Sequence, residues 1–271
     1  PQGLLSAGID VLRSLPRSST FMRMRTMRTI IFDCSGEYTV GTKTIHCHNN
    51  KRHGSEDLKT SFANSCNSSY ASLGLTLDLE QFDDLCDQML FNTALPTDFE
   101  SSKSSFVLEP GDSDSAVMET SIGQGKTLVT PFHMALIASA IANDGVLMKP
   151  YVIDRITDAE GEVVEQYEPA EYKTLLSESD ASVLQEYMRY VVEEGTATKL
   201  KSDSYEAAGK TGSAEFSSSS DATHSRFVGY AHNGEEPDIA VAVIVENSGV
   251  GSEYAVPIAK QIFDAYYTWE N

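Results

Sequence analysis

The chain has 271 residues and a formal net charge of −20 at pH 7. Hydrophobic residues make up 41% and charged residues 22%, as in ordinary soluble globular proteins. The acid excess argues against a nucleic-acid partner, because phosphate binding needs a basic surface. No run approaches the ~18 apolar residues of a membrane span, and no signal peptide opens the chain.

The charge is unevenly distributed along the chain. Residues 1–29 hold one acidic residue, Asp10, and five arginines, so their net charge is 5 − 1 = +4 and the rest of the chain holds −20 − 4 = −24. No lysine occurs in this segment, although lysine is common later. The pattern predicts two regions: an atypical basic segment at 1–29 and a domain at 30–271.

The first half of the domain is expected to be mostly helical after one hairpin. Residues 29–47 are rich in β-formers with glycine turn points, which indicates a short hairpin. Ser55 begins a partial capping box for a helix that would end near residues 65–67, and a second helix would run from Ser68 to Gly74. Residues 78–90 predict an amphipathic helix, and the polar segment 97–120 predicts a surface loop.

The second half alternates differently. The strongest helix signal follows Pro131 and ends at Asn143-Asp144-Gly145. A hairpin with a turn at Gly161 is predicted for residues 152–167, and a helix over residues 178–194 is stopped by Gly195. Two antiparallel strands within 225–249 and a closing helix at 253–269 complete an α+β order rather than a βαβ repeat.

Four cysteines, at positions 34, 47, 66 and 86, raise the question of a metal site. His46, His48 and His53 lie nearby, but no CxxC pair is present, and zinc modules usually pair their ligands closely. The spacing therefore indicates no metal site, and no cofactor is expected. A disulfide between Cys34 and Cys47 stays open at this point.

Two short motifs suggest chemistry. Ser65-Cys66-Asn67 stands at the junction of two predicted helices, and Lys210-Thr211-Gly212 opens a predicted strand. Each motif alone is weak, because its residue types are common. In this order, however, they match the second and third motifs of the S-x-x-K, S-x-N, K-T-G series of serine acyl-transferases.

Together with the surrounding segments, these motifs resemble the transpeptidase domain of penicillin-binding proteins, most closely the class B, monofunctional type. Similar stretches include "TSIGQGKTLVTPFHMALIASAIANDGVLMKPY", "AAGKTGSAEF" and "IAVAVIVENSGVGSEYAVPIAKQIFDAYY", and the resemblance extends over most of residues 30–268. One departure is Arg226, where the family often has tryptophan.

The resemblance implies an α+β fold: an antiparallel central sheet flanked by helices, with an all-helical subdomain. It also implies that the domain is truncated at its N-terminus, which would leave an edge of the central sheet unprotected. The full-length protein would act at the extracytoplasmic face of the bacterial membrane, through an anchor absent from this chain.

The resemblance further implies peptidoglycan D,D-transpeptidase activity on stem peptides, through an acyl-serine, with β-lactam antibiotics as competing ligands. Ser65 would relay a proton toward the leaving amine, and Asn67 would hold the substrate amide. Lys210 would add positive charge, and Thr211 would bind the substrate carboxylate. Gly212 completes the motif, and the N–H of Ser213 would form half of the oxyanion hole. Gly123, Gly125 and the stretch Gly195-Thr196-Ala197 are expected to shape the cleft walls.

The first motif of the series is missing. No serine in the chain has a lysine three residues later. Ser19 stands in the only S-T-F context, but the base position holds Met22, whose thioether cannot accept the proton. The distance to the second motif, 65 − 19 = 46 residues, is also about three helical turns shorter than in the family. Ser19 is therefore a weak candidate nucleophile.

Odd composition, wrong spacing and the absent lysine coincide, so we hypothesise that residues 3–29 are out of reading frame. "SAGIDV" can be encoded so that a one-base shift reads PPGSTF, and a two-base shift of "MRMRTMRT" can read AYADYEDY. Three rival interpretations of the segment stay open: a degenerate non-catalytic family member, an Arg- and Ser-rich targeting segment, and a basic arm for a partner. For the whole chain, the alternative to an enzyme is a sensor or scaffold module with this fold.

Overall fold

A central antiparallel sheet organises the protein. The computed structural model describes residues 31–215, 223–234 and 236–269. Its sheet has the order β11-β10-β9, formed by Ile239–Val245, Thr223–His232 and Glu206–Glu215. The register places Lys210 opposite Val228 and Gly212 opposite Arg226. Lys210-Thr211-Gly212 thus lies in the middle of β9, rather than at its start as the sequence suggested.

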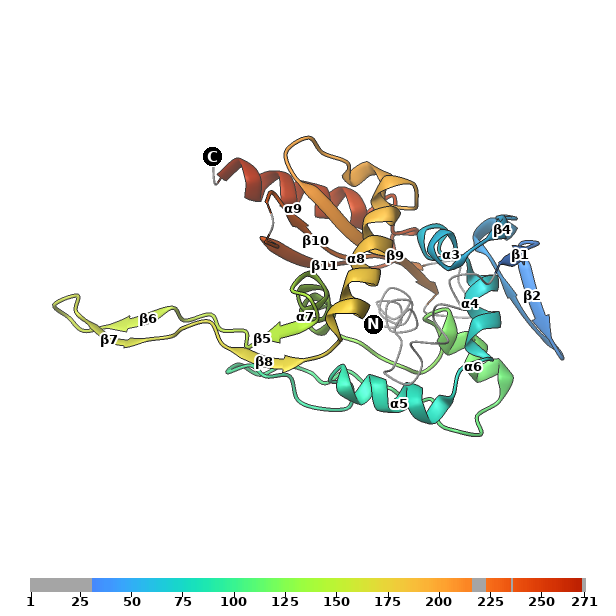
Figure 1. Cartoon of the computed structure of the whole chain (residues 1–271), viewed down its shortest axis with the longest axis horizontal. Coiled ribbons are helices and arrows are strands. Elements are labelled where there is room, and N and C mark those ends of the chain that lie inside the picture. Colours follow the sequence, from blue (N-terminus) through green and yellow to red (C-terminus); the bar gives the residue numbers. More distant parts are fainter. Residues whose placement is uncertain (1–30, 216–222, 235, 270–271) are drawn as a thin grey trace.

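Three long helices cover the sheet (Figure 1). α7 (Pro131–Ala142) and α8 (Glu178–Glu193) pack on one side, against β10–β11 and β9 respectively, and α9 (Ala255–Trp269) packs on the other. Thr130 caps α7 by accepting a hydrogen bond from the His133 N–H, and proline at the first position suits the fixed φ of a helix start. The predicted helices and late strands are confirmed.

Four shorter helices form the second part of the body. They are α3 (Leu58–Asn64), α4 (Asn67–Gly74), α5 (Leu79–Gln88) and α6 (Asp114–Ser121). The cap of α3 is Asp57, whose carboxylate accepts from the Thr60 N–H at 2.8 Å, and not the predicted Ser55, which lies in a strand. The segment 97–120, predicted as a surface loop, instead includes most of α6. This helix packs inward, with Val117 and Met118 buried in the core.

Short strand pairs surround this body. β1 (Phe32–Cys34) pairs with β4 (Gly54–Glu56), and β2 (Glu37–Val40) pairs with β3 (Lys43–His46) in the predicted hairpin. α4 packs on β1, β2 and β3. β5 (Val146–Met148) pairs with β8 (Glu171–Thr174), and β6 (Arg155–Thr157) pairs with β7 (Val163–Gln166) in an arm that extends from the body (Figure 1).

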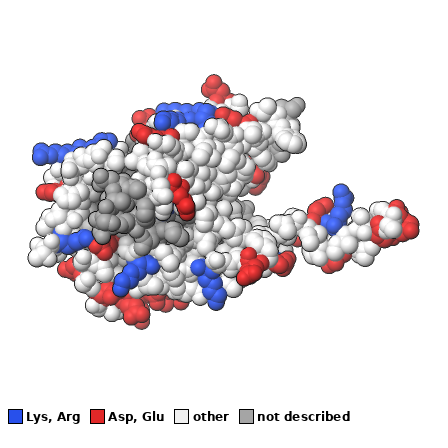
Figure 2. Space-filling model, turned by 180° about the vertical axis from the view of Figure 1, so that it is seen from behind, with Lys and Arg blue, Asp and Glu red and all other residues white. Residues whose placement is uncertain are grey.

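The surface carries the acid excess in a dispersed form. Figure 2 shows acidic and basic side chains interspersed over the visible face, with acidic residues gathered at the tip of the arm, where Asp158, Glu160 and Glu162 lie. None of the described helices combines the length and apolar character that crossing a bilayer requires. Within the described ranges, β11 pairs with β10 alone, so its outer edge forms no ladder there.

A buried histidine ties α7 to the chain before it. His133 Nε2 donates to the Met89 carbonyl at 2.7 Å, so its Nδ1 accepts from the Ser104 hydroxyl, also at 2.7 Å. Both bonds need the neutral imidazole in one tautomer. Burial lowers the pKa of His133 to about 4, from the ordinary 6.5.

This histidine should make the fold sensitive to mild acid. Between pH 6.5 and 4 the unfolded chain binds a proton at His133 that the folded chain refuses, so stability falls as pH drops through this window. We expect His133 to lower the free energy of unfolding by about 3 kcal/mol as the pH falls from 6.5 to 4. Urea unfolding at several pH values should show a shallower loss for His133→Gln.

The matched control is His48→Gln, because His48 is exposed in the short 3₁₀ turn after β3. This variant should retain the full acid dependence of the parent chain. A His133→Gln protein that loses stability as steeply as the parent between pH 6.5 and 4 would contradict the assignment.

Candidate functional site

The two sequence motifs meet in space. Lys210 Nζ donates a hydrogen bond to Ser65 Oγ at 2.7 Å and another to the Thr211 carbonyl at 3.0 Å. The ammonium also lies 5.6 Å from the centre of the Phe62 ring, within cation–π range. Lys210 is fully buried, so these contacts replace the water that its charge would otherwise need. Two motifs 145 residues apart thus form one polar centre.

The end of α3 explains the position of Ser65. Ser65 caps that helix in the left-handed conformation, with φ 53° and ψ 50°. Its N–H donates to the Phe62 carbonyl, and the next N–H, of Cys66, donates to the Ser61 carbonyl at 3.0 Å. The chain then turns sharply and begins α4 at Asn67. This turn directs the serine hydroxyl toward β9, although a non-glycine residue adopts such a φ at a cost.

A second contact joins the same two regions. Thr211 and Thr196 share a hydrogen bond between their hydroxyls at 2.6 Å, and the Thr196 N–H donates to the Ala63 carbonyl at 3.2 Å. Gly195 allows this approach, because a Cβ there would lie 2.5 Å from the Ala63 oxygen. The glycine after α8 therefore allows the stretch Gly195-Thr196-Ala197 to line the site, as the sequence suggested, and Thr196 adds a hydroxyl contact with Thr211 that the sequence did not reveal.

The remaining motif residues lie on two sides of this centre. Asn67 Nδ2 donates to the His46 carbonyl at 2.9 Å, which fixes the start of α4 to the end of β3. Ser213 follows Gly212 on β9, and its hydroxyl accepts from the Gly251 N–H at 3.0 Å. Gly251 packs so closely that a Cβ would lie 2.8 Å from the Gly212 carbonyl. Ser19 and the segment 3–29 lie outside the described residues.

A cluster of cysteines lies directly behind Ser65. The ligand-type atoms of Cys34, Cys47, His53 and Cys66 all lie within 4.8 Å of one another. Cys47 Sγ and Cys66 Sγ share a hydrogen bond at 3.8 Å. This contact lowers the pKa of Cys47 to about 4, although burial opposes the shift, and it raises the pKa of Cys66. From the sequence, Cys34, Cys47 and His53 raised the question of a metal site, but the lack of a CxxC pair argued against one, and Cys66 was not connected with them.

Arg226 occupies the β10 position beside Gly212 and is fully buried. Its three guanidinium nitrogens have no hydrogen-bond partner among the described residues. Burial lowers the pKa of Arg226 to about 10. The sequence identified this residue only as a departure from the family pattern, and its charge lies one strand away from the polar centre.

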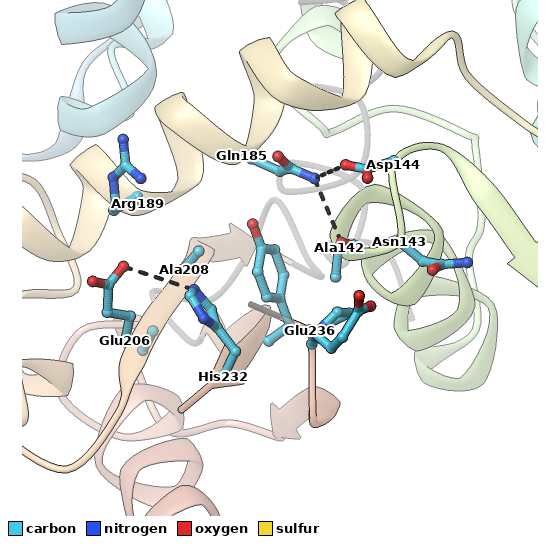
Figure 3. A pocket seen from close by; sticks show the side chains of 12 residues that line it. Ala142, Asn143, Asp144, Gln185, Arg189, Glu206, Ala208, His232 and Glu236 are labelled. Atoms are coloured by element: carbon cyan, nitrogen blue, oxygen red, sulfur yellow. Dashed lines mark hydrogen bonds and ion pairs between the residues drawn. The ribbon is translucent and has the colours of Figure 1, made fainter. Parts of the chain in front are cut away.

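Another hollow lies elsewhere and is not part of this site. Figure 3 shows it between α7, α8 and the strands, lined by the first residues of β9 before Lys210. Gln185 bridges to Asp144 at 3.0 Å, and His232 Nε2 lies 3.7 Å from a carboxylate oxygen of Glu206. These contacts join α8 to the turn after α7 and β10 to the start of β9, and they involve none of the motif residues.

Comparison with known proteins agrees with this geometry. The model of the penicillin binding protein transpeptidase domain matches residues 26–264. The peptidoglycan D,D-transpeptidase PbpA of Mycolicibacterium smegmatis is 28% identical over 213 residues, 75% of this chain and 42% of that protein. Penicillin-binding protein 3 of Bacillus subtilis is 28% identical over 217 residues, 77% of this chain and 31% of that protein. The chain thus spans less than half the length of these relatives.

Solved structures show the same fold. The D,D-transpeptidase domain of a peptidoglycan glycosyltransferase from Eggerthella lenta superposes with a TM-score of 0.83 at 23% identity, covering 97% of this chain and 64% of that one. Penicillin-binding protein A from M. tuberculosis, as a ceftriaxone acyl-enzyme complex, gives a TM-score of 0.84 at 23% identity, covering 98% and 60%. The expected fold class is confirmed.

The left-handed turn at Ser65 makes a prediction about two variants that both remove the hydroxyl. Ser65→Gly should lose the hydrogen bond to a charged group, about 1.5–3 kcal/mol. Ser65→Ala should lose the same hydrogen bond and be about 1 kcal/mol less stable than Ser65→Gly, because alanine tolerates the positive φ poorly. Urea unfolding of both variants measures the difference.

Ser72 inside α4 provides the control, because it has ordinary helical geometry. There the order should reverse, with the glycine variant less stable than the alanine variant by about 0.5–1 kcal/mol. Equal stabilities for the two Ser65 variants would show that the turn does not depend on left-handed backbone.

Proposed function

Because the chain belongs to the penicillin-binding protein transpeptidase domain family, we propose that it is the acyl-transfer domain of a serine-type peptidoglycan D,D-transpeptidase. Its substrates would be peptidoglycan stem peptides, and β-lactams would occupy the same site. The observation that supports this most directly is the 2.7 Å hydrogen bond from Lys210 to Ser65, which unites the S-x-N and K-T-G motifs.

The proposed roles follow from the positions of these side chains. Acyl transfer needs a serine nucleophile, a group that moves its proton, and donors that stabilise the developing oxyanion. Ser65, hydrogen-bonded to the Lys210 ammonium, is placed to pass a proton toward the leaving amine. Thr211 and Asn67 would bind the substrate carboxylate and amide, and the Ser213 N–H would serve as an oxyanion donor.

We further propose that the chain as written does not complete this reaction. A serine hydroxyl needs a base to become a nucleophile, and no Ser-x-x-Lys occurs in the sequence. Met22, three residues after Ser19, cannot take the proton. If residues 3–29 are read in the wrong frame, the nucleophile and its lysine are encoded but not expressed in this sequence, and resequencing the gene tests that directly.

A sensor or scaffold module is the second candidate function, and the missing first motif favours it. Such a module would bind the ligand reversibly, with the walls at Ser65 and Lys210 intact. Equilibrium binding of a β-lactam that Lys210→Ala abolishes, with no covalent product, would support the module over the enzyme.

Incubation with a labelled penicillin separates covalent from reversible chemistry. We expect intact-mass measurement to find no adduct on the chain as written, because the base is absent. Met22→Lys restores a Ser-x-x-Lys at Ser19 but not the family spacing, so it should also stay unlabelled. A chain expressed from a frame-corrected gene should instead be labelled once per molecule, and Lys210→Ala in that chain should slow labelling.

A stoichiometric adduct on Ser19 in the unmodified chain would overturn both the frame hypothesis and the role given to Met22. An uninterrupted frame, confirmed in the native gene, would overturn the frame hypothesis alone and leave the module as the better interpretation.

A further inference from the structure

Four potential metal ligands converge beneath the Ser65 turn, from four separate elements. Cys34 ends β1, Cys47 follows β3, His53 precedes β4, and Cys66 follows α3. We propose that these residues bind one Zn²⁺ ion in a tetrahedral Cys₃His site that holds the Ser65-Cys66-Asn67 turn in place. The proposal concerns the chain's own fold, so it stands whether or not the chain acylates.

Three of the six distances between the ligand atoms match the edges of a metal tetrahedron, and all six are within 4.8 Å. With a Zn–S bond of about 2.3 Å and a Zn–N bond of about 2.0–2.1 Å, tetrahedral angles place two sulfur ligands about 3.8 Å apart and a sulfur and a nitrogen about 3.5 Å apart. Cys34 Sγ lies 3.6 Å from Cys47 Sγ, and Cys47 Sγ lies 3.8 Å from Cys66 Sγ. His53 Nδ1 lies 3.4 Å from Cys34 Sγ.

The chemistry of the ligands selects the metal. Three thiolates and one imidazole in a tetrahedral arrangement suit Zn²⁺, whereas Mg²⁺ and Ca²⁺ require oxygen ligands. A disulfide is the rival use of these cysteines, but three sulfurs in mutual reach would leave one thiol over. With four protein ligands the coordination sphere is complete, which is typical of structural rather than catalytic zinc sites.

The surroundings are those of a closed site. Cys34, Cys47 and Cys66 are exposed by only 3%, 2% and 0%, and the His53 side chain by 5%. Ser68 Oγ lies 3.1 Å from Cys47 Sγ, where its hydroxyl can donate to a thiolate and steady it. The three cysteines form a buried cluster of their own, apart from the main core, with Phe32 packed against it.

The site connects the metal to the catalytic wall through one residue. Cys66 is the middle residue of the S-x-N motif, so a Zn–S bond at Cys66 would anchor the turn whose left-handed residue presents the Ser65 hydroxyl to Lys210. On the other side, Asn67 bonds the His46 carbonyl, one residue before the ligand Cys47. Loss of the metal should therefore loosen Ser65 and Asn67 together.

Metal content provides the first test. Chain purified under reducing conditions should hold about one zinc per molecule by plasma mass spectrometry, and Cys34→Ser and Cys66→Ser should reduce this to below about a tenth. Cys86→Ser is the matched control, because Cys86 is buried in α5, outside the cluster, and should retain full occupancy.

Cobalt provides a test that does not depend on the folding of variants. Titration of the metal-free parent chain with Co²⁺ should give thiolate-to-metal charge-transfer absorption and the intense visible bands of tetrahedral cobalt, saturating at about one equivalent. Added Zn²⁺ should then displace the cobalt. Absence of these bands, a metal other than zinc at full occupancy, or a Cys34–Cys47 disulfide in the purified chain would overturn the proposal.

Hydrogen exchange tests the link to the motif. Removal of zinc by a chelator should raise amide exchange in residues 61–70 by about tenfold or more, while residues 79–88 of α5 should change little. Unchanged exchange in residues 61–70, in a chain shown to bind zinc, would overturn the role in holding the turn.

Discussion

The contact between Lys210 and Ser65 is the constraint around which this domain is arranged. A fully buried ammonium needs polar partners, and these come from two parts of the chain that are far apart in sequence. For these partners to reach Lys210, α3 must end just before Ser65, which adopts the left-handed conformation, and β9 must keep its register against β10. Gly195 allows the chain after α8 to approach Ala63 in α3, and Gly251 allows the chain before α9 to approach Gly212 in β9, since neither position has room for a side chain.

The periodicity of apolar residues, together with the proline and glycine residues that begin and end elements, made most of the helices and strands predictable. α7 follows a proline and stops at an Asn-Asp-Gly turn, and the late strands are continuous apolar runs. Errors arose where local signals compete. Ser55 and Asp57 both resemble caps, but Ser55 pairs with Asp33 in the β1–β4 ladder, so the helix begins after Asp57. The segment around α6 is polar in composition, yet Val117 and Met118 turn inward to the core, which composition does not reveal.

The proposed functional residues also differ in how far the sequence alone could identify them. Ser65, Asn67, Lys210 and Thr211 could be identified because their order along the chain matches a known series of motifs. Thr196 could be named only as part of a wall-forming stretch, because its hydroxyl contact with Thr211 joins two elements that are not adjacent in sequence. The spacing of Cys34, Cys47, His53 and Cys66 did not predict that they lie together. The intervals are 47 − 34 = 13, 53 − 47 = 6 and 66 − 53 = 13 residues, with no CxxC pair. Strand pairing and the end of a helix bring these residues together instead.

The proposed zinc site would also account for how the short strands β1 to β4 support the left-handed turn at Ser65. β1 to β4 are three or four residues each, and such short strands bury little apolar surface. A metal ion that joins β1, the β3 end, the β4 start and the α3 end would replace the missing core at the point where the left-handed serine stores strain. The wall formed by Ser65 and Asn67 would then be rigid before any substrate arrives. Preorganisation of this kind lets polar groups act without rearranging, and it does not depend on whether a nucleophile faces them.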